Sequence, residues 1–182
     1  MKDLDLNLKE IEVRPFSTRE DYEGMINYFI TAKDTFLRGI GVDPTKLPKK
    51  EDWLPLVLLD LEKEDMSKDR FCLGWRYQGK PVGHSSINKI KVGEESYIHL
   101  HLWESSLRKK GLGSEFFKQS VNFYFRRFAF KRIVCEPFAD NPAPNRVLSK
   151  LGFRFIKKYR TTPGNINFEQ EVNQYELTHP IG

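Results

Sequence analysis

The residues from Arg108 to Gly113 have the types and spacing of a site for a phosphate group. The pattern is Arg-x-x-Gly-x-Gly, with Lys109 and Lys110 before the first glycine. Glycines let a ligand approach the backbone closely. A helix that begins here offers unpaired N–H groups and the positive end of its dipole. The spacing differs from the dinucleotide fingerprint and from the P-loop. By itself, the hexapeptide is more typical of a solvated basic turn.

Two histidines, His99 and His101, form a second candidate group for chemistry. Their i, i+2 spacing places both on one face of a strand. An imidazole with an unperturbed pKa near 6.5 suits a general base at neutral pH. The same spacing occurs in zinc sites, but no nearby Cys, Asp or third His completes a ligand set, so we predict no metal. Packing beside Trp103 is the alternative. Tyr97 begins the same strand and is the third candidate catalytic residue.

The elements on either side of Arg108–Gly113 must aim these groups. An apolar run over residues 97–103 predicts a strand, and residues 114–128 predict a helix. Within that helix one apolar stripe faces the core. The stripe consists of Phe117, Val121, Tyr124, Phe125 and Phe128. The strand, the glycine-bearing turn and the start of the helix together predict a cradle for a phosphate.

A second motif lies downstream, from Asn145 through Leu151, Gly152 and Phe153. Together with the Arg-x-x-Gly-x-Gly turn it resembles the GCN5-related N-acetyltransferase (GNAT) family. The resemblance runs from about Phe71 to the C-terminus. It implies a mixed α/β fold, with a mostly antiparallel sheet of about seven strands flanked by about four helices. It also implies a V-shaped split between the strands before and after the cradle.

The resemblance implies acetyl-CoA as the acyl donor and an amine as the acceptor. The pyrophosphate would accept hydrogen bonds from backbone N–H groups around Lys110, Gly111, Leu112, Gly113 and Ser114. The pantetheine arm would lie along the open edge of the strand that ends at Leu102 and Trp103. A backbone N–H near Leu102 would polarise the thioester carbonyl. Asn141 would either bond the arm or cap a helix, and Asn145 is better explained as the cap of its own helix.

Two positions depart from the family pattern. Many members carry a tyrosine as proton donor in the helix before Leu-Gly-Phe, where this chain has Leu148. Many also carry a glutamate near the start of the strand before the cradle, about where Tyr97 stands. Three hypotheses follow: an N-acetyltransferase acting on a small molecule or a peptide, a non-catalytic acyl-CoA-binding regulatory module, and a basic protein associated with nucleic acid.

Composition limits these hypotheses. The 182 residues are 39% hydrophobic and 30% charged, which predicts a single globular domain, 1–182, with a loose segment at 1–9. Residues 108–132 hold eight basic residues and one acid. This charge suits a small polyanion, and without a nucleic-acid-binding motif we expect no nucleic acid. We expect Cys72 and Cys135 to be buried reduced thiols. No signal or membrane-spanning run is evident, so we expect a cytoplasmic monomer or homodimer.

The remaining patterns complete the expected order βααβββαβαββ. Strands are predicted at 10–14, 71–77, 82–90, 131–137, 153–159 and 172–178, and helices after a Ser17–Glu20 capping box, at about 51–64 and at 145–151. Gly152 should end the last helix in a left-handed conformation.

Overall fold

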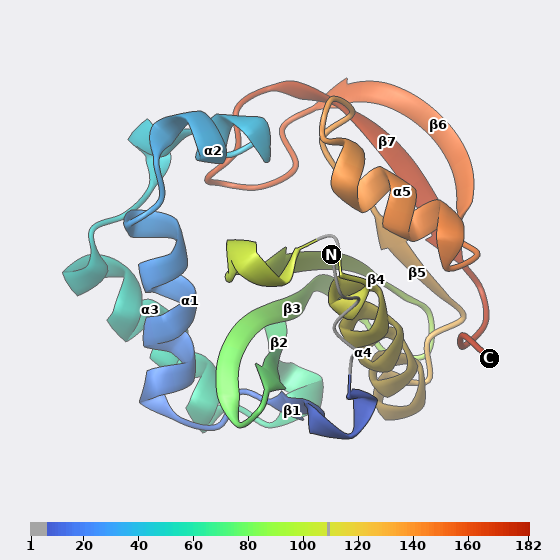
Figure 1. The fold of residues 1–182 in the computed structure, drawn as a ribbon, viewed down its shortest axis with the longest axis horizontal. Helices are drawn as coiled ribbons and strands as arrows, with labels where there is room; N and C mark the ends of the chain where they lie inside the picture. The colour runs from blue at the N-terminus through green and yellow to red at the C-terminus, as the bar shows by residue number, and fades with distance from the viewer. Residues whose placement is uncertain (1–6, 109) are drawn as a thin grey trace.

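The fold is a curved seven-stranded sheet with helices on both faces, as the computed structural model shows for residues 7–108 and 110–182 (Figure 1). The strand order is β1-β2-β3-β4-β5-β7-β6, and every neighbouring pair is antiparallel except β4 and β5. The strands are β1 (Ile11–Pro15), β2 (Arg70–Tyr77), β3 (Lys80–Lys91), β4 (Glu95–Leu102), β5 (Arg132–Cys135), β6 (Arg154–Thr161) and β7 (Gln170–Leu177). The predicted sheet is therefore confirmed.

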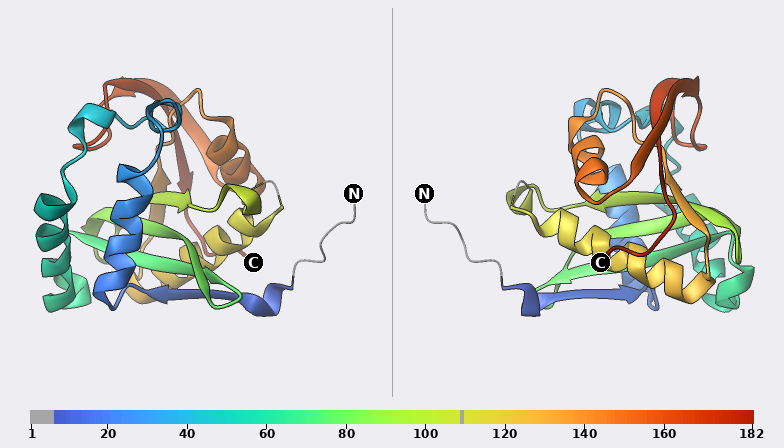
Figure 2. Two further views of the ribbon diagram at one scale, coloured as in Figure 1. Left: turned by 60° about the vertical axis from the view of Figure 1, so that its left-hand side comes forward. Right: turned by 90° about the vertical axis from the view of Figure 1, so that its right-hand side faces the viewer.

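Five α-helices pack around this sheet within the described residues, one more than the number implied by the resemblance. They are α1 (Arg19–Ile30), α2 (Asp34–Gly39), α3 (Lys50–Glu62), α4 (Leu112–Phe128) and α5 (Pro142–Lys150). The short helix α2 was not expected, because glycines and prolines interrupt the pattern there. Figure 2 shows α1 and α3 together on one face of the sheet and α4 on the other.

Two hydrophobic clusters hold the layers together. The larger cluster lies between α4 and the sheet, where the indole of Trp75 stacks on Phe116 at 5.2 Å and donates a 2.9 Å hydrogen bond to Ser120 Oγ. The smaller cluster packs α1, α2 and α3 against the opposite face. Burial of large aromatic side chains on both faces fixes the sheet relative to its helices.

Local sequence explains most helix and strand ends, with some corrections. The capping box that opens α1 is formed by Thr18 and Asp21, one residue beyond the predicted Ser17–Glu20 pair. Helix α4 begins at Leu112, two residues before the predicted start. Gly152 has φ +84°, and the Phe153 N–H bonds to Leu148 O, so the predicted left-handed helix end is confirmed.

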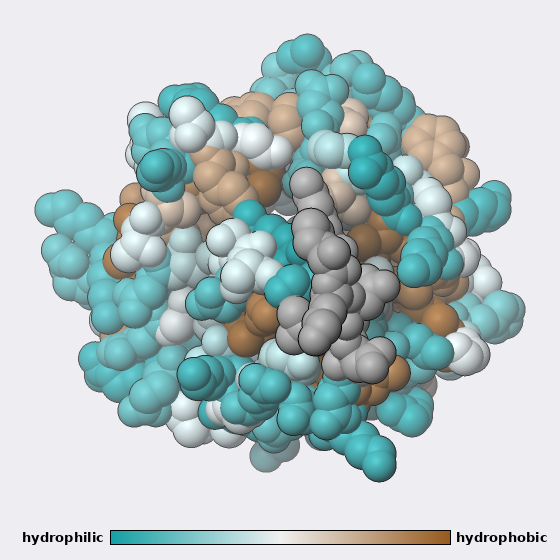
Figure 3. Space-filling view, viewed as in Figure 1, coloured by the Kyte–Doolittle hydropathy of each residue, from teal (hydrophilic) through white to brown (hydrophobic). Residues whose placement is uncertain are grey.

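Two further segments complete the shape. Leu8–Glu10, within the segment expected to be loose, form a 3-10 helix, and residues 1–6 lie outside the described part. The loop between β6 and β7 lies against the segment after α2. Gly41 O accepts hydrogen bonds from Asn167 Nδ2 at 2.8 Å and Gln170 Nε2 at 2.9 Å. Figure 3 shows mostly hydrophilic residues on the face viewed in Figure 1, with hydrophobic residues exposed toward its centre.

Candidate active site

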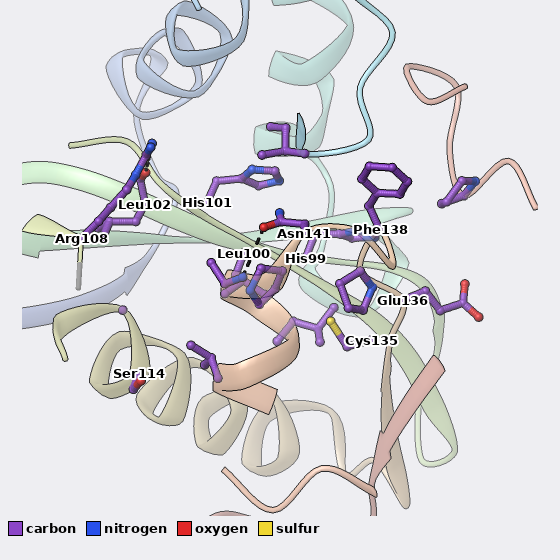
Figure 4. A pocket seen from close by; sticks show the side chains of 18 of the residues that line it. His99, Leu100, His101, Leu102, Arg108, Ser114, Cys135, Glu136, Phe138 and Asn141 are labelled. Atoms are coloured by element: carbon purple, nitrogen blue, oxygen red, sulfur yellow. Dashed lines mark hydrogen bonds between the residues drawn. The ribbon is translucent and has the colours of Figure 1, made fainter. Parts of the chain in front are cut away.

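The sheet splits between β4 and β5, and the split opens a cavity. The two strands pair in parallel over just three residues of each, Glu95–Tyr97 with Arg132–Val134. Beyond Tyr97 the strands diverge. A cavity of about 410 Å³ opens there, and it is lined from β4, the start of α4, the segment after β5, α1 and α2 (Figure 4). The predicted V-shaped split is therefore present.

The edge of β4 that faces this split carries free backbone groups. The Trp103 N–H bonds to Val82 O at 2.8 Å, on the β3 side. Because hydrogen-bonding directions alternate along a strand, the N–H and C=O groups of Leu100 and the N–H of Leu102 point toward the split, while the C=O of Leu102 accepts from Arg108. An extended ligand lying in the cavity would meet these groups as a further strand does.

The N-terminus of α4 closes one end of the cavity. Gly111 is the N-cap, with φ +83°, a left-handed conformation that favours glycine. The N–H groups of Ser114 and Glu115 bond to Gly111 O at 3.0 and 3.3 Å. Those of Leu112 and Gly113 precede them and have no acceptor within the helix. A β-carbon at Gly113 would meet just Leu102 Cδ2, at 4.0 Å. This helix start therefore has the open N–H groups and the space that an anion requires.

Arg108 lies beside the end of β4. Its guanidinium donates to Leu102 O at 3.0 Å and lies 4.8 Å from the centroid of the Phe36 ring. Figure 4 shows this side chain beside Leu102 at the end of β4. The first residue of the predicted cradle is thus held between β4 and α2, and it brings a positive charge to the wall of the cavity.

His101 belongs to a row of aromatic side chains on the α1 face of the sheet. Its ring stacks on His84 at 4.9 Å, with 18° between the planes, and the rings of Phe29 and Tyr28 lie 5.1 and 5.5 Å away. Trp103 Nε1 donates to His84 Nδ1 at 2.9 Å. An indole N–H can donate but cannot accept, so His84 Nδ1 must be the acceptor. Neutral His84 therefore carries its proton on Nε2.

The two predicted histidines line the cavity, but their pKa values differ from the expected one. Burial, followed by the positive charges of Arg70 and Lys89, lowers the pKa of His99 to about 4. Burial, followed by His99, lowers the pKa of His101 to about 3. Both rings are therefore neutral at pH 7, and the expectation of a base titrating near 6.5 is wrong. His99 Nε2 lies 3.3 Å from Asn88 Oδ1.

The structure brings eight of the predicted site residues to this one cavity. They are His99, His101, Leu102, Arg108, Gly111, Gly113, Ser114 and Asn141. Asn141 is the N-cap of α5, with its Oδ1 accepting from the Ala143 N–H at 3.3 Å, which leaves its amide N–H₂ available. Asn141 is thus a cap that also lines the cavity.

Six predicted residues are not among the described residues that line this cavity. Tyr97 pairs with Val134 at the base of the split, under Lys89, and burial raises its pKa. The Leu112 side chain is fully buried in the core, and Lys110 is exposed. Lys109 lies outside the described residues. Trp103 packs in the smaller core cluster, on the α1 side of β4.

Asn145 is the sixth of these residues. It lies within α5, so the expectation that it caps this helix is wrong. Its Nδ2 donates to Asn141 O at 2.6 Å and Phe138 O at 3.2 Å, while its Oδ1 accepts from Asn173 at 2.8 Å. These bonds fasten the start of α5 to β7.

Sequence reasoning missed the residues that enclose the far side of the cavity. Tyr28 and Phe36 come from α1 and α2, Ile40 follows α2, and Glu136 and Phe138 follow β5. Burial raises the pKa of Tyr28 to about 12. The helical pattern of α1 gave one usable signal, since Tyr28 lies next to the apolar stripe. The split of the sheet, which exposes all five residues to one space, has no signature in their own segments.

No other arrangement in the described residues suggests different chemistry. No three His, Cys, Asp or Glu side chains within residues 7–108 and 110–182 are placed to hold a metal ion. The same residues contain no helix long and apolar enough to cross a membrane. Cys72 and Cys135 are buried free thiols, as expected.

Comparison with known proteins agrees with this geometry. Residues 10–154 match the family model described as the acetyltransferase (GNAT) domain. The chain belongs to the GNAT family. It is accordingly an acyltransferase whose acyl donor is acetyl-CoA. No curated protein sequence gave a significant match.

Solved GNAT structures share the fold at low sequence identity. RimL, a ribosomal L7/L12 alpha-N-protein acetyltransferase in complex with coenzyme A, is 18% identical at a TM-score of 0.75, over 96% of this chain and 97% of that chain. MccE, a microcin C7 self-immunity acetyltransferase in complex with acetyl-CoA and AMP, is 17% identical at a TM-score of 0.73, over 92% of this chain and 93% of that chain. Spermidine N-acetyltransferase from Vibrio cholerae, in complex with CoA and spermine, is 13% identical at a TM-score of 0.74, over 93% of this chain and 95% of that chain.

The two departures from the GNAT pattern can now be placed. Leu148, at the position of the usual tyrosine, is fully buried between α5 and the core. Tyr97, at about the position of the usual glutamate, lies below the cavity, at the base of the split. Neither position therefore brings an acid or a base to this GNAT cavity, and the neutral rings of His99 and His101 remain.

We expect Trp103→Phe to reduce the free energy of unfolding by about 1–3 kcal/mol beyond the effect of ring size. The phenyl ring fills most of the same space but leaves the buried Nδ1 of His84 without its donor. Trp53→Phe, in the same cluster, is the matched control, because Trp53 packs on Phe29 at 5.8 Å. Urea unfolding of both variants measures the difference, and equal losses would show that the indole N–H contributes nothing.

Proposed function

We propose that this protein is an acetyl-CoA-dependent N-acetyltransferase that acts on a primary amine of a small molecule or a peptide. The acceptor amine attacks the thioester directly, without an acyl-enzyme. One observation carries the proposal: the start of α4, the free edge of β4 and two neutral histidines line a single cavity. These are a binding site for a phosphate, a template for an extended arm, and hydrogen-bond acceptors for an amine.

The residues present fit coenzyme A. The N–H groups of Leu112 and Gly113 would hold the pyrophosphate, with Arg108 and Lys110 adding positive charge. Each charge-assisted hydrogen bond contributes about 1.5–3 kcal/mol, so a few of them supply the ~8 kcal/mol of micromolar binding. The free groups of Leu100 in β4 and the amide of Asn141 would bond the pantetheine arm from its two sides.

The reaction needs a polarised carbonyl and an acceptor for the proton of the amine. The N–H of Leu102, which points toward the split, would donate to the thioester oxygen. His99 or His101 would accept the amine proton, directly or through a water, because both rings are neutral at pH 7. Positioning of the amine beside the thioester supplies the rest of the rate enhancement.

The second candidate is an acyl-CoA-binding regulatory module. The buried Leu148 favours it, since the side chain that donates a proton in many relatives is missing. Assays of thiol release with acetyl-CoA and a panel of amines separate the two functions. Turnover supports the transferase, whereas tight CoA binding without turnover supports the module.

Four broader features are part of the same proposal. Residues 1–182 form one catalytic domain, which acts as a monomer or a homodimer. It works in the cytoplasm, in keeping with two reduced buried thiols. It does not act on nucleic acid. Two arginines of residues 108–132 are already paired with acids: Arg127 pairs with Asp65, and Arg132 pairs with Glu95 and Glu176.

We expect CoA and acetyl-CoA to stabilise the fold. A ligand that binds the native state at a hundredfold its Kd adds about 2.7 kcal/mol to the free energy of unfolding. A thermal-shift titration up to millimolar concentration measures this effect. Pantetheine, which lacks the pyrophosphate, is the control ligand. An unchanged melting temperature with CoA would contradict the assignment of the cradle.

A further inference from the structure

The wall of the cavity offers almost no negative charge to an acceptor. Among the described lining residues, Glu136 carries the single carboxylate and Arg108 the single permanent positive charge. The remaining wall is built mainly from apolar side chains and neutral polar groups. A cationic acceptor therefore finds little in this cavity to replace the water that it leaves.

The carboxylate of Glu136 is engaged elsewhere. Its Oε1 accepts hydrogen bonds from Tyr159 Oη and from Gln174 Nε2, the second at 2.7 Å. Figure 4 shows the carboxylate pointing away from His99 and His101. Its partners come from β6 and β7, on the far arm of the split. Glu136 is thus held toward the sheet, where it does not face an amine placed between the histidines and the thioester.

Arg108 acts in the opposite sense. Its guanidinium contacts Leu102 O and the Phe36 ring, so its charge stands at the side of the cavity where α1 and α2 close over β4. Tyr28 and Phe36, both on this side, line the cavity and an adjoining groove together with Arg108. The groove also carries Lys33 and Glu104, so its two positive charges and one negative charge leave it net positive, which disfavours cations.

The histidines accept hydrogen bonds but are weak bases. With pKa values of about 4 and 3, they lie roughly six pH units or more below a lysine or polyamine ammonium of pKa about 10.4. At pH 7 about 0.04% of such an amine is in the free form, compared with roughly 15% of an α-amino group of pKa about 7.8. The second class supplies the nucleophile without a strong base.

We propose that the acceptor of this enzyme is an amine of low basicity, of the class of the α-amino groups of peptides and amino acids, which binds as the free base. The proposal rests on the proposed N-acetyltransferase function and names its substrate class. His99 or His101 then accepts the one proton that the nitrogen loses as the bond between nitrogen and the acetyl carbon forms and the C–S bond breaks. The proton passes on to the released thiolate or to water.

The proposal predicts a pH dependence set by the acceptor. Below the pKa of the amine, kcat/KM should rise tenfold per pH unit, and it should level off above that pKa. Two titratable groups of the protein face the histidines, Tyr28 of α1 and His84 of β3. Burial raises the pKa of Tyr28 to about 12 and lowers the pKa of His84 well below its usual value, so neither titrates between pH 6 and 9. The other charged groups around the histidines are Arg70 of β2, Lys89 of β3 and Arg108, whereas the Glu136 carboxylate points away from them.

The test uses one synthetic peptide that carries both a free α-amino group and one lysine. After incubation with the full-length enzyme and acetyl-CoA at pH 7, mass spectrometry locates the acetyl group. We expect at least tenfold more α-acetylation than ε-acetylation. Separate rates for alanine amide, which has a free α-amino group, for Nα-acetyl-lysine amide and for spermidine give the same comparison in kcat/KM. The preference should narrow between pH 7 and pH 9, since the ε-amine fraction keeps increasing.

The outcomes separate this proposal from the function beneath it. If the ε-amine or spermidine is acetylated as fast as the α-amine at pH 7, the proposed substrate class is wrong and the transferase function stands. If no amine is acetylated although CoA raises the melting temperature, both the substrate class and the catalytic function are overturned. A preference for the α-amine with a pH-independent kcat/KM would also overturn binding as the free base.

Discussion

We expect His99→Ala and His101→Ala to lower kcat by at least tenfold while leaving CoA affinity nearly unchanged. Both rings line the cavity next to the free edge of β4, and both are neutral at pH 7. A positioned base contributes about 10² to 10⁴ in rate. The contacts expected for CoA come from other residues. Steady-state kinetics gives kcat, and a thermal-shift titration gives CoA affinity.

The pH profile tests the same assignment. A histidine whose pKa is lowered to about 4 is deprotonated, and able to accept a proton, at every pH above that value. The wild-type kcat should therefore show no histidine titration near pH 6.5, and the inflection that belongs to His99 should lie near pH 4. His179→Ala is the matched control, because His179 is exposed near the C-terminus. Near-normal kcat in both single variants and in the double variant would make these histidines packing residues.

The second large effect is expected at Gly113. Gly113→Val should weaken CoA binding by at least tenfold and lower the free energy of unfolding by less than about 1 kcal/mol. Gly113 is the second residue of α4, and a β-carbon there points into open space beside Leu102. A branched side chain would therefore stand where we propose that the pyrophosphate binds, although the helix itself can accept it.

Gly39→Val provides the comparison for this variant. Gly39 ends α2, and a β-carbon there would meet nothing within 4 Å. Both variants place valine at a helical glycine with space around it, but just one of the two lines the cavity. Calorimetric CoA titration and urea unfolding are measured for each. Normal CoA binding by Gly113→Val, or loss of its fold, would assign that glycine a structural role or none.

Much of the fold follows from local patterns in the chain. Alternating residues predicted the strands, and the apolar stripe from Phe117 to Phe128 predicted α4, because these periods reflect which side chains face the core. The left-handed conformation of Gly152 at the end of α5 was also predicted, from its residue type. Where local signals compete, prediction was less exact. Ser17 and Thr18 are both good N-caps, and the choice between them depends on Asp21, which also bonds Arg14 of β1.

The candidate site divides in the same way. The proposed cradle could be predicted from the sequence, because Gly111 and Gly113 lie at the start of the same helix, within three residues of each other. The acceptor side was not, since Tyr28, Phe36 and Phe138 come from three separate segments. The short helix α2 was missed for a related reason. It has six residues, and its position depends on contacts of the following segment with the loop after β6.

The sequence by itself therefore determined the order of the seven strands and of four of the five α-helices in the described residues, the glycine-bearing start of α4 and the two histidines on one face of β4. All of these depend on residues close together in the chain, where backbone geometry sets the spacing. The tertiary structure alone decided the chemical state of the site. His99 and His101 have ordinary side chains, but burial keeps both neutral, with the positive charges of Arg70 and Lys89 adding to the effect at His99. Desolvation depends on what surrounds a group in three dimensions, and no local pattern records it.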